Sequence, residues 1–166
     1  MKQVVSYLLS CILLFTVFFF APTNTQASGS PQIVAGTATS VVTGPDTASG
    51  NAKFVIGSKS YTATFSIVFA IMPPDANGVS QTVSSHIFTV KDSKGRAAGT
   101  FTTSDKGVLR PVPNKPGFFT LSNDLKIVSG TGSFSNTKGD IHTENLLDFN
   151  ATPPTGSTVL FGLVTN

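Results

Sequence analysis

The stretch SYTATFSIVFAI, residues 60–71, indicates the class of fold most clearly. Its odd-numbered positions from Tyr61 to Ile71 are all apolar or aromatic, whereas its even-numbered positions from Thr62 to Ser66 are polar. Successive side chains of a β-strand point to opposite faces, so this period of two predicts a strand with one buried face. Val68 and Ala70 then make the second face apolar as well, which predicts burial on both faces towards the end of the strand.

The rest of the chain follows the same pattern, and no stretch shows a sustained helical period. Turn residues such as Asn77-Gly78 separate the runs at short intervals, because glycine accepts a positive φ without strain. Eight or nine short strands without crossover helices predict an antiparallel β-sandwich or β-barrel. The further strands are expected at residues 33–43, 52–56, 81–90, 97–103, 118–122, 124–128, 141–149 and 158–164.

Residues 1–27 have the pattern of a secretory signal peptide. Lys2 precedes a long apolar run, and Thr25-Gln26-Ala27 places small residues at the −3 and −1 positions of a cleavage site. The sequence therefore predicts a secreted or extracytoplasmic protein with one domain over residues 28–166. If the segment is not cleaved, its length suits a membrane anchor.

Composition excludes several classes of function for this domain. Cys11 is the only cysteine and lies in the leader, so the domain has no disulfide and no thiolate ligand or nucleophile. The formal net charge is +3, and the cationic residues are scattered singly along the chain. Nucleic-acid binding needs a clustered basic surface, so no nucleic-acid partner is expected.

The glycines at 130, 132 and 139 first suggest a phosphate-binding loop. Gly130-Thr131-Gly132 begins like a dinucleotide fingerprint, but Ser135 stands where that motif needs glycine, and no helix-forming segment follows. We therefore predict that Gly130, Gly132 and Gly139 form a structural turn between two strands, with Phe134 as a core residue. No cofactor is predicted.

The weak candidates for a catalytic site are His86, Asp140, His142 and Glu144. Asp140, His142 and Glu144 alternate along one predicted strand and share a face, which we expect to point to solvent. One histidine with acidic neighbours lacks the three ligands of a typical catalytic zinc, so no metal site is predicted. His86 alternates with Phe88 and Val90, which places it on an inward face.

Other hydrolytic sites have little support in the sequence. No Gly-x-Ser-x-Gly elbow is present for a serine nucleophile. A glycosidase needs two facing carboxylates, but Asp140, Glu144 and Asp148 are neighbours on one strand.

Residues 99–141 contain a spaced set of aromatic, aliphatic and glycine positions: Phe119, Leu121, Ile127, Gly130, Thr131, Gly132, Phe134 and Gly139. This pattern resembles one found in small exported bacterial β-proteins and in the allene oxide cyclase and dirigent group of eight-stranded, calycin-type barrels. The resemblance implies a single antiparallel β-barrel of about eight strands, with an apolar interior that admits a small hydrophobic molecule. No catalytic residue is carried over from that group.

Three functional hypotheses remain open. The first is a module that binds a small apolar ligand or a surface partner without catalysis. The second is an isomerase or cyclase of the allene oxide cyclase or dirigent kind, and the third is a structural envelope protein. Polar residues that point into the barrel would favour the enzyme.

Overall fold

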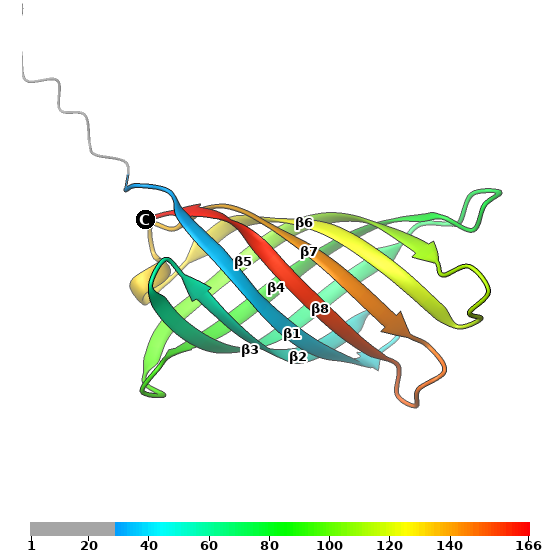
Figure 1. The fold of residues 1–166 in the computed structure, drawn as a ribbon, viewed down its shortest axis with the longest axis horizontal. Helices are drawn as coiled ribbons and strands as arrows, with labels where there is room; N and C mark the ends of the chain where they lie inside the picture. Colours follow the sequence, from blue (N-terminus) through cyan, green and yellow to red (C-terminus); the bar gives the residue numbers. More distant parts are fainter. Residues whose placement is uncertain (1–28) are drawn as a thin grey trace, which may run out of the picture.

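The computed structural model describes residues 29–166, which form a closed barrel of eight antiparallel strands (Figure 1). The predicted signal peptide lies outside the described residues. Each strand pairs with its neighbours in sequence, and β1 pairs with β8 to close the barrel. The strands are β1 (Gln32–Gly44), β2 (Thr47–Ile56), β3 (Lys59–Ile71), β4 (Ser80–Asp92), β5 (Ala97–Pro111), β6 (Phe118–Gly130), β7 (Lys138–Asp148) and β8 (Thr155–Thr165).

The prediction of an all-β barrel of about eight strands is confirmed, but several strand boundaries are wrong. β2 begins at Thr47 and not at residue 52, and the two largest errors lie in β6 and β5. Residues 118–122 and 124–128 form one strand, β6, because Asn123 points into the barrel and does not interrupt the pairing. β5 continues past Thr103 to Pro111, through a polar segment that resembles a turn in the sequence.

One end of the barrel is closed by the short 3-10 helix η2 (Gly132–Phe134), at the end where β1 begins and β8 finishes (Figure 1). Phe134 is 2 % exposed, and its ring packs against those of Tyr61 and Phe101 at centroid distances of 5.7 and 5.4 Å. The prediction of a turn with Phe134 in the core is confirmed. The loops β3–β4, β5–β6 and β7–β8 lie at the opposite end, which we call the mouth (Figure 1).

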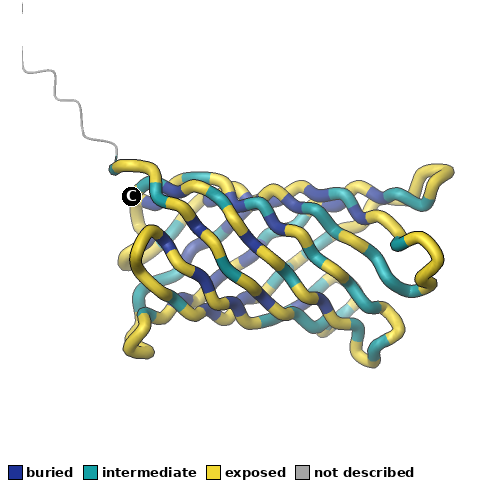
Figure 2. The backbone as a smooth tube through the Cα atoms, viewed as in Figure 1, coloured by how far each residue is buried: buried dark blue, intermediate teal, exposed yellow. Residues whose placement is uncertain are grey.

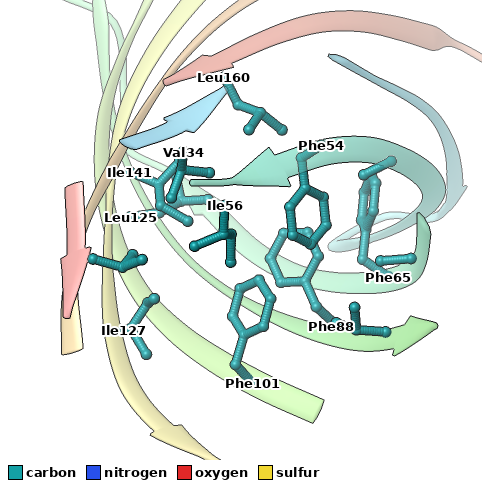
Figure 3. Close-up of a cluster of buried hydrophobic side chains, with 14 of the residues drawn as sticks. Val34, Phe54, Ile56, Phe65, Phe88, Phe101, Leu125, Ile127, Ile141 and Leu160 are labelled. Carbon is teal, nitrogen blue, oxygen red and sulfur yellow. The ribbon is translucent and has the colours of Figure 1, made fainter. Parts of the chain in front are cut away.

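Buried and exposed residues alternate along the strands, as Figure 2 shows. Towards the closed end the interior is apolar, with rings such as Phe54, Phe88 and Phe101 gathered beside aliphatic side chains (Figure 3). The Phe88 and Phe101 rings stack with centroids 4.4 Å apart. The apolar core therefore fills the closed end of the barrel, and the cavity lined by residues of the mouth lies outside this core.

β3, which contains the stretch at residues 60–71, is buried on one face only. Ala63 and Phe65 are buried, but Val68 is 59 % and Ile71 is 45 % exposed. The prediction of burial on both faces is wrong because no element within residues 29–166 packs on the outer face of β3, and because Ile71 lies at the mouth. Among residues 29–166, no helix is long and apolar enough to cross a membrane.

Candidate functional site

A belt of polar side chains crosses the interior between the closed end and the mouth. Its members project inward from six of the eight strands, where an up-and-down barrel with a purely structural core would carry apolar residues. Buried polar groups cost free energy unless they are paired, so stability of the fold alone does not explain why so many lie at one level of the barrel. The belt consists of Ser40, Thr82, Ser84, His86, Thr103, Asp105, Asn123, Thr143, Asn145 and Thr158.

His86 and Asp105 form the centre of the belt. The imidazole Nδ1 lies 2.6 Å from Asp105 Oδ2, and the hydroxyl of Ser84 donates to the same oxygen at 3.0 Å. The Asp105 side chain is 0 % exposed and that of His86 is 11 % exposed. The pair joins adjacent strands, because Ser84 and Asp105 are register partners on β4 and β5.

Packing fixes the orientation of the His86 ring. It stacks on Phe88 with centroids 5.5 Å apart and planes 11° from parallel, and it also packs against Phe65 at 5.8 Å. The backbone N–H of His86 donates to Thr103 Oγ1 at 3.3 Å. With Nδ1 directed at a buried carboxylate and both neighbouring rings in contact, the imidazole has little freedom to turn.

Two polar atoms of this pair remain without a protein partner. Asp105 Oδ1 is buried and makes no hydrogen bond within the described part of the chain. His86 Nε2 likewise has no hydrogen-bond partner among residues 29–166, and His86 lines the cavities described next. Natural interiors pair nearly all buried polar atoms, so the unpaired Oδ1 marks Asp105 as chemically unusual. His86 Nε2 is not fully buried and can be reached from the cavities.

Two adjacent cavities meet at the belt. The mouth cavity has a volume of about 100 Å³, and a deeper cavity of about 50 Å³ lies towards the apolar core. Both are lined by Ser40, Ile67, His86 and Asn145, so His86 stands where the two spaces join. The apolar wall of the mouth cavity comprises Val42, Ala48, Ile67, Phe69, Ile71, Leu109, Leu121, Leu147 and Phe149.

Asn123 places an amide on the wall of the mouth cavity. Thr82 Oγ1 donates to Asn123 Oδ1 at 3.4 Å, and Nδ2 makes no hydrogen bond within residues 29–166. The neighbouring inward position on β5 is Gly107, where a Cβ would overlap the Asn123 amide and lie 2.7 Å from Thr82 Oγ1. The absence of a side chain at Gly107 therefore makes room for the amide.

The remaining predicted site residues lie on the outside of the barrel. Asp140, His142 and Glu144 alternate on β7 with buried Ile141 and Thr143, so they face outward as expected. The structure therefore does not bring them together with His86, which lies inside. No group of three or more His, Cys, Asp or Glu side chains within residues 29–166 is arranged to hold a metal ion.

His142 is the centre of a surface cluster. Its Nδ1 lies 2.7 Å from Asp124 Oδ1 and its Nε2 lies 2.9 Å from Glu144 Oε1, while Ser122 donates to Glu144 at 2.9 Å. The hydrogen bond to Asp124, and next that to Glu144, raises the pKa of His142 above its ordinary value of 6.5. The hydrogen bonds from His142 and Ser122 lower the pKa of Glu144 below 4.5.

These shifts predict a pH-dependent contribution to stability. A raised histidine pKa stabilises the fold below 6.5 and loses that effect as the pH rises through the folded-state pKa. A lowered carboxyl pKa stabilises above 4.5 and loses its effect as the pH falls through the folded-state pKa. We expect His142→Gln to lower the free energy of unfolding by up to about 1 kcal/mol at about pH 5.5, and by much less at about pH 9.

Urea unfolding of the variant and the wild type at both pH values measures this difference. Asp92→Asn is the control. Asp92 pairs with Arg96 at 2.6 Å, and the hydrogen bond from Arg96 lowers the pKa of Asp92 below its ordinary value of 3.8, so this carboxylate is ionised at both pH values. Its effect should be the same at both pH values. An equal effect of His142→Gln at both pH values would show that Asp124 and Glu144 do not stabilise the protonated imidazole.

Sequence reasoning placed His86 inside but missed its partners. Asp105, Gly107 and Asn123 fall outside the predicted strands, which cover residues 97–103, 118–122 and 124–128 in this part of the chain. The signal that would have found Asp105 is its alternation with Phe101 and Leu109.

Comparison of the chain with family models, with curated proteins and with solved structures gives no match.

Proposed function

We propose that the barrel binds a small, mainly apolar molecule that enters through the mouth and places a polar group against the belt. The observation that carries this proposal is the mouth cavity, whose wall is apolar and which His86 and Asn123 also line. Small-molecule sites typically combine an apolar wall with a few placed polar groups. A barrel interior that served stability alone would be filled by side chains at this level.

The size of the cavity restricts the ligand. An apolar cavity of about 150 Å³ in another protein binds benzene. The mouth cavity, at about 100 Å³, accepts a narrower group, such as an alkyl chain or a single small ring. Because the cavity is reached through the mouth, a longer molecule can project past Phe69, Ile71 and Phe149.

Burial of an alkyl chain supplies the expected affinity. Each methylene removed from water contributes about 0.8 kcal/mol, so affinity should rise with chain length until the chain leaves the apolar wall. The hydroxyl of an alkanol can meet the belt at the other end. The series butanol, hexanol and octanol therefore probes both parts of the site.

We predict that Ala48→Leu weakens binding of octanol at least about tenfold, because about three added carbon atoms occupy space that the alkyl chain needs. Ala48 is buried, lines the mouth cavity and lies at the start of β2. Titration of the labelled protein with octanol, followed by amide chemical shifts, gives the dissociation constant and the residues that respond.

Ala70→Leu is the matched control, because Ala70 has the same side chain but lies exposed on the outer face of β3. It should bind octanol as the wild type does. Shifts confined to the outer face, or no saturable binding by any member of the series, would refute the proposal. Native mass spectrometry of protein purified from its own host then identifies the natural ligand.

Two further proposals concern the setting of this function. We propose that the protein acts outside the cytoplasm, because residues 1–27 have the pattern of a signal peptide. We also propose a relation to the allene oxide cyclase and dirigent barrels. It is supported by the eight-stranded antiparallel closure and by the Gly130-Thr131-Gly132 turn that carries Phe134 into the core.

A further inference from the structure

We infer that the belt is also a proton-transfer site, in which His86 acts as a general base on the bound molecule. The substrate class is a small unsaturated ketone, and the reaction is migration of its double bond into conjugation with the carbonyl. This inference rests on the proposed function, because the ketone must occupy the mouth cavity. It assigns roles to Asp105 and Asn123 as well.

The contact with Asp105 fixes the proton on one nitrogen of the imidazole. A carboxylate oxygen 2.6 Å from Nδ1 accepts a hydrogen bond, so in the neutral ring the proton lies on Nδ1. The lone pair is then on Nε2, which has no partner among the described residues. Asp105 is thus a positioning residue, and Ser84 holds its carboxylate in place.

A purely structural histidine would look different. Buried histidines in cores satisfy both ring nitrogens, because an unpaired polar atom costs free energy. Within residues 29–166 only Nδ1 of His86 is paired. Nε2 is left open to the cavities, and Phe65 and Phe88 hold the ring in this place. The arrangement leaves Nε2 available as a base and holds the ring between Asp105 and two aromatic side chains.

Asn123 supplies a hydrogen-bond donor for the negative charge that develops on the carbonyl oxygen. Removal of a proton next to a carbonyl places negative charge on the carbonyl oxygen, and an N–H donor that faces this oxygen lowers the barrier. Asn123 is 6 % exposed and lines the same cavity as His86, and its Nδ2 makes no hydrogen bond within residues 29–166. Gly107 keeps the space that this amide occupies.

The reaction balances without any other reactant. His86 Nε2 takes a proton from the carbon between the carbonyl and the double bond, and the electron pair of that C–H bond delocalises onto the oxygen as a dienolate. The Asn123 amide donates a hydrogen bond to this oxygen. The Nε2–H then returns the proton to the far carbon of the former double bond, and the double bond moves next to the carbonyl.

The probe for this activity is the linear β,γ-unsaturated ketone 4-penten-2-one, whose narrow chain suits a cavity of about 100 Å³. Its conjugated product absorbs in the ultraviolet, so the rate can be followed directly. We expect the wild-type protein to accelerate the reaction about 10²–10⁴-fold over buffer, the usual contribution of a placed general base. Octanol should inhibit competitively, because it occupies the same cavity.

The variants separate the roles. His86→Gln should abolish the acceleration, and Asn123→Leu should lower kcat with a smaller change in KM. Asp105→Asn should lower kcat and change the pH profile, and nitrogen NMR should show that the proton no longer stays on Nδ1. His142→Gln, whose imidazole lies on the outer face, should leave the rate unchanged.

Gly107→Ala tests the amide without removing it, because the added methyl group meets the flexible end of Asn123. It should reduce kcat in the same direction as Asn123→Leu. Circular dichroism confirms the fold of each variant, and if Asp105→Asn does not fold, Ser84→Ala replaces it as the test of carboxylate positioning.

Two results distinguish the inference from the proposed function. If octanol binds in the mouth but the ketone isomerises no faster than in buffer, or equally fast with His86→Gln, the inference is overturned while the binding function stands. If neither octanol nor the ketone binds, both fail. Acceleration lost in His86→Gln and retained in His142→Gln supports the inference.

Discussion

Replacing Phe134 with alanine is expected to lower the free energy of unfolding by about 3–5 kcal/mol. Phe134 is 2 % exposed and closes one end of the barrel, where its ring contacts Tyr61 and Phe101. Loss of the ring leaves a cavity that the closed β-wall cannot collapse to fill. Urea unfolding followed by circular dichroism measures the change.

Phe161→Ala is the matched control, because Phe161 is 51 % exposed on the outer face of β8. Its loss should cost less than about 1 kcal/mol, the scale of a cross-strand surface pair. Equal losses for the two variants would mean that η2 is not part of the cooperative core.

A second large loss of stability is expected for a substitution at Gly139, which lies at the other end of the turn between β6 and β7. Gly139 has φ of +140°, a conformation that side chains rarely adopt, and a Cβ there would overlap the carbonyl oxygen of Leu163 and lie 2.8 Å from the Cα of Val164. Gly139→Ala should cost about 1–3 kcal/mol from backbone strain alone. The overlap with β8 adds to this cost, since it pushes the two strands apart.

Gly95→Ala separates the cost of backbone strain from the cost of overlap with a neighbouring strand. Gly95 also has a positive φ, of +78°, but an added Cβ would meet nothing within 4 Å. This variant should lose only about 1–2 kcal/mol, the cost of the left-handed conformation. Thermal unfolding of both variants compares them, and a loss at Gly139 no larger than at Gly95 would show that the strand contact is unimportant.

The period of two along the chain was sufficient to predict the class of fold and the direction of most side chains. It placed Ala63 and Phe65 inside, His86 inside and His142 outside, because alternation depends only on local geometry. It did not predict which residues meet across strands. That depends on register, and the register between β4 and β5 brings Ser84 opposite Asp105.

The polar belt was missed for a physical reason. Hydrophobic patterning assumes that the inward face is apolar, so a polar residue on that face is taken as the end of a strand. Asp105, Gly107 and Asn123 are such residues, and the two largest errors in the predicted strands, at β5 and β6, lie at these positions. These two errors therefore coincide with the candidate site, as expected where function overrides the folding pattern.

The pairing of β1 with β8 has a consequence for how the chain acquires its structure. Gln32 lies opposite Val164, so the barrel can close only when the last strand made reaches the first. Until then both strands have free edges, which are templates for pairing with other chains. Contacts between such distant residues form slowly, so ring closure is expected to set the folding rate. The order of synthesis thus keeps the polar belt open to water until the final strand is in place.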